Sequence, residues 1–440
     1  MTHQEVELLA IGAGPSNLAL AIAIDELAPA ELAASTLVIE RDDTVSWQRG
    51  MLLPDALSQV SFLKDLVTLR NPMSPFSFIN YLHANGRLND FVNMGSFVPF
   101  RVELAGYFEW AASALSRVRL ECGRECVGIE PQISADGDVE RWLVRLADGS
   151  TIGCRHLVVG AGRDAHIPDA FTGLPHERVI HSTQYQQRIS LLDKDVPRRV
   201  AVIGAAQSAA EMFNAVQRDL PQCKPTMIMR SIGLSGYESS KFTNELFYPS
   251  FVDDFFEAVP DARRQMLAEM HRTNYAGLAP ATIDSLYRQV YLDRLTGEHR
   301  LGMIPMADVV SSHADRDEVV LELRDRRTGS VRELRTDLVL LGTGFVREMP
   351  RMVRDLSASL GLDRVEVTRH YRLVQPRPTT ATCHLQGVNE ATHGIADSLL
   401  SVLATRAHEI ALDIFAHHDN AKAAPADELE QFDLGPVAVS

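Results

Sequence analysis

Cysteine is scarce in this chain of 440 residues: there are five, and none stands in a Cys-x-x-Cys pair. An odd number without paired spacing argues against a disulfide framework or a thiolate metal site, and predicts a reducing compartment, the cytoplasm. The 15 histidines form no HExxH pattern, so we predict no metal site. Runs of about 20 apolar residues, which a membrane span requires, are also missing, and we expect no membrane segment.

Positive charge is in deficit. Lysine and arginine supply 43 residues against 58 aspartates and glutamates, which gives a formal net charge of −15. A surface that binds nucleic acid needs the opposite sign, so nucleic acid is not an expected partner. The 45% of apolar and 23% of charged residues are ordinary for globular proteins and exclude wholesale disorder. The length predicts two or three domains.

The first pattern that carries chemistry is a glycine-rich turn. Glu5–Ile11 reads as a buried strand, Gly12-x-Gly14-x-x-Asn17 follows it, and an apolar helical run continues to about Leu27. Gly12 permits the tight turn, and Gly14 lets backbone N–H groups approach a pyrophosphate. The turn therefore predicts a dinucleotide site. A glycine turn of an ordinary α/β protein remains the alternative, because Asn17 replaces the usual third glycine.

Other residues near this turn belong to the expected site. Pro15 and Ser16 open the helix, where the backbone N–H groups favour an anion. Glu40 ends the next strand, Thr36–Glu40, where a carboxylate can bind a ribose hydroxyl. The order of strand, glycine turn, helix and strand indicates a βαβ unit and a parallel sheet.

The same pattern restarts about 190 residues later. Arg199–Ile203 reads as a strand, and Gly204-Ala-Ala-Gln207-Ser208 opens a helix. The methyl of Ala206 stands where the backbone approaches a phosphate most closely. Arg230 closes the following strand, where it either pairs with the 2′-phosphate of NADP or is a surface arginine. We expect Gly204, Gln207, Ser208 and Arg230 to bind this second dinucleotide. Two such units in one chain make a flavin and a nicotinamide the leading hypothesis.

An unusual segment follows the first unit. Gln59–Phe78 is mostly apolar yet carries Gln59, Lys64 and Asp65. Lys64 either reaches solvent along its own methylene groups or is a fixed cation that faces a substrate carboxylate. The motif SFLKDL within this segment resembles the flavin-dependent ornithine/lysine N-monooxygenases of hydroxamate siderophore pathways. The same resemblance is carried by three further motifs: FTNELF (Phe242–Phe247), RTNY (Arg272–Tyr275) and LQGVNEATHGIADSLLS (Leu385–Ser401).

The resemblance runs from the first strand through Ser401 and implies a reaction. In that family the first glycine-rich loop binds FAD and the second binds NADPH. NADPH reduces FAD, and the reduced flavin takes up O₂ to form a C4a-hydroperoxide that hydroxylates the terminal amine of an amino acid. Because water destroys that species, the protein must supply a closed, dry pocket. The family also suggests a homo-oligomer, a tetramer.

The resemblance further implies roles for single residues. Lys64, Asn244 and Asn274 would contact the amino-acid substrate, and Ser401 would lie near the substrate and the flavin. Gln59 would lie beside the flavin and the nicotinamide. We therefore expect Gln59, Lys64 and Asn274 to be catalytic. Further cofactor contacts are expected at Trp47, Asn274, Leu399 and Leu400. Gly342-Thr-Gly344-Phe345 corresponds to a family turn in which Ala is usual at the place of Gly342.

The expected fold class is α/β, with two Rossmann-like domains and a small helical substrate-binding subdomain. A last long helix is expected from about Ile395 to Phe415. The chain would pass between the domains more than once. The expected order is FAD domain 1–165, NADPH domain 166–236, helical subdomain 237–300, NADPH domain 301–335, FAD domain 336–418 and a flexible tail 419–440.

The substrate is left partly open. Lys64 and Asn274 favour a substrate with a carboxylate over a bare diamine such as putrescine or cadaverine. L-Ornithine is favoured over L-lysine as the commoner family substrate. Among other FAD/NADPH oxidoreductases, a disulfide reductase would need a redox-active cysteine pair, which this sequence lacks.

Overall fold

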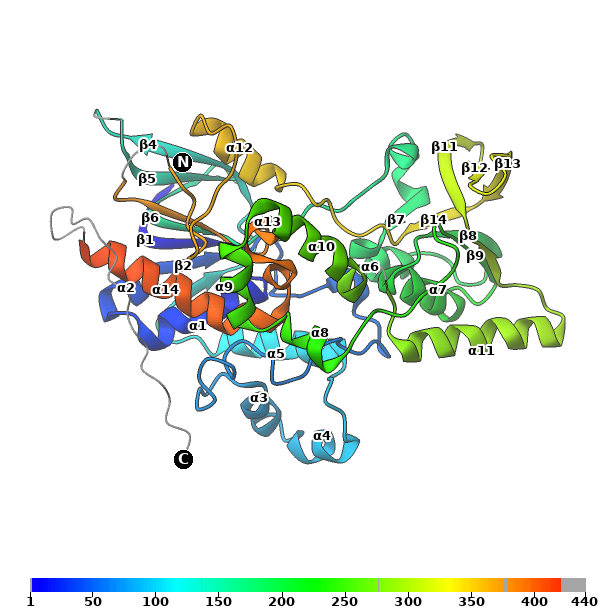
Figure 1. Cartoon of the computed structure of the whole chain (residues 1–440), viewed down its shortest axis with the longest axis horizontal. Helices are drawn as coiled ribbons and strands as arrows, with labels where there is room; N and C mark the ends of the chain where they lie inside the picture. The colour runs from blue at the N-terminus through cyan, green and yellow to red at the C-terminus, as the bar shows by residue number, and fades with distance from the viewer. Residues whose placement is uncertain (1, 136, 276, 376–378, 421–440) are drawn as a thin grey trace.

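The computed structural model describes residues 2–135, 137–275, 277–375 and 379–420. Figure 1 shows two α/β units side by side, with a group of short helices between them. The chain enters the second unit and returns to the first, as expected from the two glycine-rich loops. Residues 421–440, most of the expected tail, lie outside the described part. Asp419, where the expected tail begins, belongs to the last helix.

The first unit is built on a seven-stranded sheet with the order β3-β2-β1-β6-β5-β4, and β15 pairs with β6. β1 is parallel to β2 and β6, whereas β4, β5 and β6 are antiparallel neighbours. The strands are β1 (His3–Ile11), β2 (Thr36–Ile39), β3 (Arg119–Glu121), β4 (Cys126–Ile133), β5 (Val139–Leu146), β6 (Thr151–Val159) and β15 (Thr382–Leu385).

The second unit has a five-stranded parallel sheet with the order β10-β9-β8-β14-β7. Its strands are β7 (Val179–His181), β8 (Arg198–Ile203), β9 (Cys223–Ile228), β10 (Gly302–Ile304) and β14 (Leu338–Leu341). A separate antiparallel sheet is made of β11 (Ala307–Asp315), β12 (Glu318–Asp325) and β13 (Val331–Thr336). Because β14 pairs with β7 and β8, the chain leaves the second unit after β14, and the expected boundary at 336 falls too early.

Helices cover both sheets. The first unit carries α1 (Pro15–Leu27), α2 (Ala30–Ala34), α3 (Phe78–Ala84), α4 (Leu88–Met94), α5 (Arg101–Ser113), α12 (Arg351–Ser359), α13 (Glu390–His393) and α14 (Leu403–Asn420). The second carries α6 (Tyr185–Ile189) and α7 (Gln207–Asp219). Short 3-10 turns are η1 (Arg49–Met51), η2 (Asp169–Phe171), η3 (His176–Arg178), η4 (Ser182–Gln184), η5 (Ile395–Ser398) and η6 (Leu400–Val402). No described helix is long and apolar enough to cross a membrane.

The expected helical subdomain divides in two. α8 (Lys241–Glu245), α9 (Pro249–Glu257) and α10 (Pro260–Asn274) lie against the first unit, where α9 and α10 contact α13. α11 (Pro280–Thr296) packs instead on α7 of the second unit, where Gln217 Nε2 donates to Gln289 Oε1 at 3.1 Å. The helices beside the first unit therefore remain as the expected cover of the substrate pocket.

The last long helix is shorter than expected, because Ile395–Val402 forms two 3-10 turns and α14 starts only at Leu403. Between these turns Leu399 is extended, with φ −112° and ψ 162°. The break has a cause in polar contacts. Asp397 is fully buried and pairs with Arg406. In a continuous helix the two residues would lie about two and a half turns apart on opposite faces, and this pair could not form.

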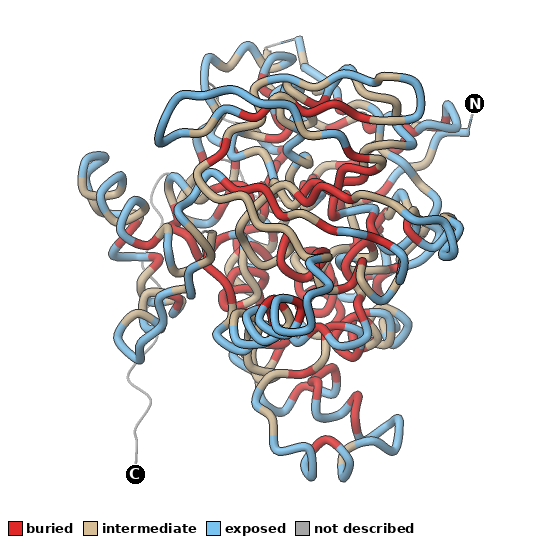
Figure 2. Tube along the Cα trace, turned by 90° about the vertical axis from the view of Figure 1, so that its right-hand side faces the viewer, coloured by how far each residue is buried: buried red, intermediate tan, exposed pale blue. Residues whose placement is uncertain are grey.

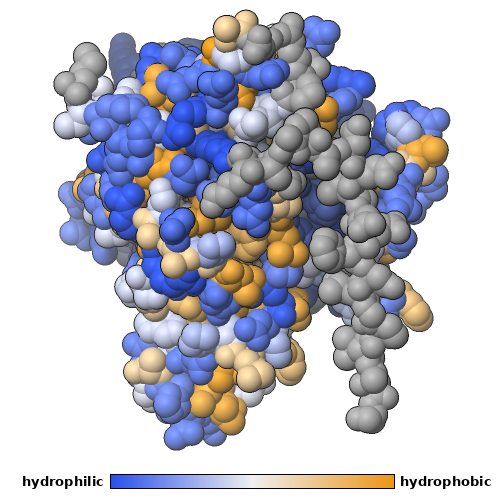
Figure 3. All heavy atoms as spheres, turned by 90° about the vertical axis from the view of Figure 1, so that its left-hand side faces the viewer, coloured by the Kyte–Doolittle hydropathy of each residue, from blue (hydrophilic) through white to orange (hydrophobic). Residues whose placement is uncertain are grey.

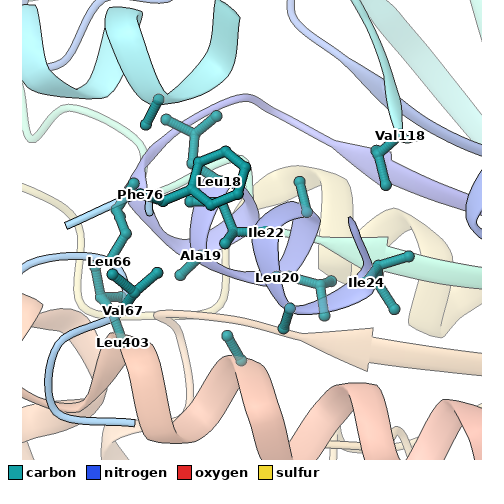
Figure 4. Packing of buried hydrophobic residues seen from close by; sticks show 14 of the residues in the cluster. Leu18, Ala19, Leu20, Ile22, Ile24, Leu66, Val67, Phe76, Val118 and Leu403 are labelled. Carbon is teal, nitrogen blue, oxygen red and sulfur yellow. The ribbon is translucent and has the colours of Figure 1, made fainter. Parts of the chain in front are cut away.

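The main core lies between the first sheet and α1, α5 and α14. In Figure 4, Leu66 and Val67 lie beside Leu403 and below Leu18 of α1. Buried segments run through the interior, and the outer loops are exposed (Figure 2). The face of the first unit in Figure 3 is largely hydrophilic, with apolar residues gathered near its middle.

One buried ion pair joins the two units. Arg101, which starts α5, donates two hydrogen bonds of 2.8 Å to the carboxylate of Glu211 on α7. Arg101 also donates to the Met51 carbonyl at 2.8 Å. Because both charged side chains are buried and bidentate, the pair fixes the orientation of α7 relative to the first unit.

Candidate active site

Lys64 and Ser401 meet although they lie at opposite ends of the first unit's sequence. Lys64 Nζ donates to Ser401 Oγ at 2.9 Å. Burial removes part of the water around the Lys64 ammonium and lowers its pKa. A partly desolvated cation next to a hydroxyl is well suited to receive a carboxylate.

The backbone that follows Lys64 is fixed by its neighbour Asp65. This buried carboxylate accepts hydrogen bonds from the backbone N–H groups of Val67 (2.9 Å), Thr68 (2.6 Å) and Phe78 (2.8 Å). Sequence analysis singled out Lys64 in this motif and gave no role to Asp65. The carboxylate closes the turn, and the side chain of Lys64 is left free to point toward Ser401.

Hydrophobic packing brings the two polar side chains together. Leu66 and Val67 pack in the same cluster as Leu403. Leu66 lies two positions after Lys64, and Leu403 lies two positions after Ser401. Figure 4 shows these apolar side chains side by side. The burial of the apolar neighbours therefore sets the position of the polar pair.

The asparagines predicted to bind substrate lie on the helices that cover this place. Asn244 is exposed on α8, and Asn274 is half-buried at the end of α10. A hydrophobic cluster joins both helices to the turn of Ser401; its members include Leu246, Phe247, Met270, Tyr275, Ile395, Leu399 and Val402. Within the described residues, Lys64 Nζ donates to Ser401 and to neither asparagine. The structure brings their segments together, and their contact with substrate stays a prediction.

A polar network that sequence analysis missed holds the end of α10. Tyr275 Oη donates to Glu390 Oε2 at 2.6 Å and lies 3.3 Å from Ser398 Oγ. Arg163, on the segment that leads to the second unit, donates to the same Glu390 oxygen at 3.4 Å. Burial, together with the charge of Glu390, raises the pKa of Tyr275 to about 12, so its hydroxyl stays a donor. The network places Asn274, the residue before Tyr275.

The first glycine-rich loop has the form that a dinucleotide requires. At Gly12, where φ is +92°, a Cβ would lie 2.9 Å from the Gly160 carbonyl oxygen. A Cβ at Gly14 would meet nothing within 4 Å, so the start of α1 is open. Glu40 lies at the loop, where Oε2 accepts from the Ala13 N–H at 2.7 Å and Oε1 from the Asp42 N–H at 3.1 Å; its contact with a ribose stays a prediction. Pro15 occupies the first turn of α1.

Two predicted ligands in this loop are engaged by the protein itself. Asn17 is fully buried; its amide donates to the carbonyls of Ile11 (2.9 Å) and Gly12 (2.8 Å). Ser16 Oγ accepts from Arg406 at 2.8 Å. The side chain of Asn17 therefore shapes the loop from beneath, and the contact of this residue with a cofactor stays a prediction.

The second loop is packed more tightly. Gly204 has φ +136°, and a Cβ there would lie 2.5 Å from the Gly342 carbonyl oxygen. A Cβ at Gly342 would lie 2.5 Å from the Cβ of Ala209 on α7. The close approach of α7 to the end of β14 therefore explains why glycine stands at position 342, where the family turn usually has alanine. The first turn of α7 carries Ser208, which is partly exposed.

Gln207 differs from its expected role. Its amide donates to Glu211 Oε1 (2.9 Å) and Thr282 Oγ1 (3.1 Å), and its oxygen accepts from the Ala279 N–H (3.0 Å). These bonds tie α7 to the start of α11, which leaves little capacity for a cofactor. Arg230 is exposed just beyond β9, as expected. Its guanidinium has no partner among the described side chains, so it is available to an anion.

The remaining predicted cofactor contacts lie in several surroundings. Gln59 is exposed, and Trp47 packs edge-on against Phe108 with 5.4 Å between ring centroids. Leu399 packs with the cluster of α8 to α10, and Leu400 packs on the core of the first unit. The structure does not test their contact with a cofactor.

Known proteins are similar to this chain in sequence and in fold. A family model described as L-lysine 6-monooxygenase/L-ornithine 5-monooxygenase matches residues 4–347. The L-ornithine N(5)-monooxygenase of Burkholderia cepacia is 40% identical over 400 residues, which cover 88% of this chain and 89% of that protein.

Two solved structures are similar over nearly the whole chain. Ornithine hydroxylase (PvdA) from Pseudomonas aeruginosa has a TM-score of 0.87 at 35% identity and covers 94% of this chain and 100% of its own. The Kutzneria sp. 744 ornithine N-hydroxylase KtzI, in the form with FADred, NADP+ and L-orn, has a TM-score of 0.86 at 33% identity, with the same coverage. The chain with Lys64, Ser401 and two dinucleotide loops therefore belongs to the L-lysine 6-monooxygenase/L-ornithine 5-monooxygenase family.

Proposed function

We propose that this enzyme hydroxylates the side-chain amine (N5) of free L-ornithine, with FAD, NADPH and O₂. The observation that carries the proposal is the contact between Lys64 and Ser401 at the place where α8 to α10 meet the first unit. The relatives named for L-ornithine support this substrate over L-lysine and over the diamines.

The two loops fit the two cofactors. The turn at Gly12 and Gly14, with Glu40 beside it, would hold FAD, and the loop at Gly204 with Arg230 would hold NADPH. When bound, FAD supplies the activation of O₂, with NADPH as the source of electrons. The part of the protein is to bind these groups, to orient the substrate and to exclude water.

Lys64 would bind the substrate carboxylate, with Asn244 and Asn274 holding the same end of the amino acid. The length of the side chain then sets how near its terminal amine comes to the flavin. Such positioning is worth several kcal/mol when the reacting atoms are held in line. Gln59 would lie at the flavin and nicotinamide. The hydrophobic cluster around Phe247, Ile395 and Val402 would keep this space dry.

The test is an assay of NADPH oxidation together with detection of the hydroxylamine product, on L-ornithine, L-lysine, putrescine and cadaverine. We expect hydroxylamine from L-ornithine, with less from L-lysine and least from the diamines, which have no carboxylate for Lys64. NADPH consumption that yields H₂O₂ alone on all four compounds would reject the hydroxylase. A product from L-lysine in preference to L-ornithine would reject only the choice of substrate.

We also propose that the chain forms a homo-oligomer, a tetramer. α11 presents an exposed apolar row, with Tyr287 68%, Tyr291 56% and Leu295 67% exposed. A row of this kind favours contact with a second copy of the chain. Sedimentation would show a tetramer, and Leu295→Glu would reduce its size.

The described cysteines are all free, which supports a reducing compartment, the cytoplasm.

A further inference from the structure

Three side chains that sequence spacing could not connect converge on one face of the first sheet. Glu7 lies on β1, His156 on β6 and His418 near the end of α14. One ligand atom of each, a carboxylate oxygen or a ring nitrogen, lies within 4.8 Å of the other two. Glu7 is five residues before Gly12, so the group lies about 15 Å from the first glycine-rich loop.

His156 is prepared as a ligand. It is fully buried, and its Nδ1 lies 2.9 Å from Thr382 Oγ1. Its Nε2 is buried and has no hydrogen-bond partner in the described part of the chain. A buried nitrogen without a hydrogen-bond partner is unfavourable, and binding a ligand would relieve this.

His418 also has a buried ring nitrogen without a described hydrogen-bond partner. This nitrogen, Nδ1, lies 3.8 Å from Glu7 Oε2. A separation of 3.8 Å is too long for a hydrogen bond. In a zinc site with bonds of about 2 Å, ligand atoms lie about 3.3 Å apart. Small rotations of His418 and Glu7, which are partly exposed, would bring the three atoms to that spacing.

Arg155 is the nearby cation that could oppose a metal. Its guanidinium is held by backbone carbonyls: Nε donates to Thr380 at 3.1 Å and Nη2 donates to His417 at 2.9 Å. The neighbouring His384 is paired with Asp413 at 2.7 Å. Both groups are therefore engaged elsewhere, and the ring nitrogens of His156 and His418 are left to one another and to Glu7.

We propose that Glu7, His156 and His418 bind one divalent transition-metal ion of the zinc class, which fastens α14 to β1 and β6. Two imidazoles and a carboxylate form a donor set that zinc uses, with water as the fourth ligand. Thr382 would orient His156 from the second ring nitrogen, as metal-bound histidines require. The site is separate from the proposed reaction, and its role is to stabilise the C-terminal helix.

The test uses the FAD-loaded protein after treatment with a chelator and dialysis. Titration with Zn²⁺, followed by calorimetry and metal analysis, should give one ion per chain, and Mg²⁺ should not compete because it prefers oxygen ligands. Zn²⁺ should raise the Tm. His418→Ala and Glu7→Gln should each lower the Zn²⁺ affinity at least about tenfold, which is 1.4 kcal/mol, and His418→Ala should remove the rise in Tm.

The matched control is His417→Ala, the adjacent helix histidine, whose Nδ1 pairs with the Asp413 carbonyl at 2.7 Å. It should bind Zn²⁺ as the unaltered chain does. Flavin absorbance and circular dichroism would report that each variant is folded. Absence of stoichiometric Zn²⁺, or an equal loss of affinity in His417→Ala and His418→Ala, would overturn the proposal. Because the readouts are metal content and Tm, failure here leaves the proposed hydroxylase untouched.

Discussion

Lys64 is the residue on which recognition of the substrate carboxylate depends. In Lys64→Ala we expect the KM for L-ornithine to rise about 10- to 100-fold, because a hydrogen bond to a charged group is worth about 1.5–3 kcal/mol. Reduction of the flavin by NADPH should change little, since Lys64 lies with Ser401 and not at the second loop. Steady-state and stopped-flow kinetics measure the two effects.

Lys194→Ala, at an exposed lysine, is the matched control and should leave KM unchanged. If Lys64→Ala also leaves KM unchanged, Lys64 does not bind the substrate.

Gly342 tests the close approach of α7 to β14. In Gly342→Ala the new Cβ would lie 2.5 Å from Ala209 Cβ and 2.7 Å from Ala209 Cα. We expect α7 to shift at a cost of about 1–3 kcal/mol. The KM for NADPH should rise, while the FAD content stays the same, because Gly342 lies in the second unit. Urea unfolding and NADPH kinetics give the two values.

The control for Gly342 is Gly233→Ala, where a Cβ meets nothing within 4 Å and no left-handed backbone is involved. An unchanged unfolding midpoint in Gly342→Ala would mean that α7 yields at no cost.

At the scale of elements, the segment between α13 and α14 decides where Ser401 lies. Its sequence is apolar enough to continue the helix, but two short turns replace the first part of that helix. Arg406 and Asp397 are both buried and pair at 2.9 Å, and Asp397 also accepts from the Asn389 N–H at 2.7 Å. The two turns let the buried carboxylate of Asp397 accept from both Arg406 and the Asn389 N–H. A continuous helix would take the carboxylate away from the Asn389 N–H.

Removal of Arg406 should therefore be costly. We expect Arg406→Met to lower the free energy of unfolding by about 3–5 kcal/mol, because Asp397 would remain as an unpaired buried charge. It should also weaken FAD binding, since Arg406 donates to Ser16 at the start of α1. The double variant Arg406→Met/Asp397→Leu should recover much of the stability. Equal losses in the single and double variants, measured by urea unfolding, would show that the pair is not coupled.

At the scale of the whole molecule, buried neutral histidines make stability depend on pH. Burial lowers the pKa of His156 to about 2 and of His393 to about 4, whereas both titrate near 6.5 in the unfolded chain. Between about pH 6.5 and 4 the unfolded chain thus binds more protons than the folded chain. The free energy of unfolding should therefore decrease as the pH is lowered through this window, by up to about 1.4 kcal/mol per pH unit for each histidine.

The measurement is urea unfolding at pH 7, 6 and 5 with a chelator present. His393→Gln should make the pH dependence shallower, and His313→Ala, at an exposed histidine, should leave it as it is. A free energy of unfolding that is constant from pH 7 to 5 would contradict the argument.

Sequence by itself determined the class of the fold, the two glycine-rich loops and the family. These rest on local properties: apolar periodicity fixes strands and helices, and a positive φ at Gly12 or Gly204 requires glycine wherever the rest of the chain lies. The expected strand before each loop and the helix after it are confirmed. The SFLKDL motif likewise marked Lys64, although its partner was not apparent.

Only the tertiary structure decided which distant residues meet. The pairing of Lys64 with Ser401, the place of β14 in the second sheet, and the convergence of Glu7, His156 and His418 all join segments far apart in sequence. The same holds for Asn17, whose amide is taken up by the backbone beneath the loop. Such contacts follow from the packing of apolar faces and the need to pair buried polar groups, and neither is written in local spacing.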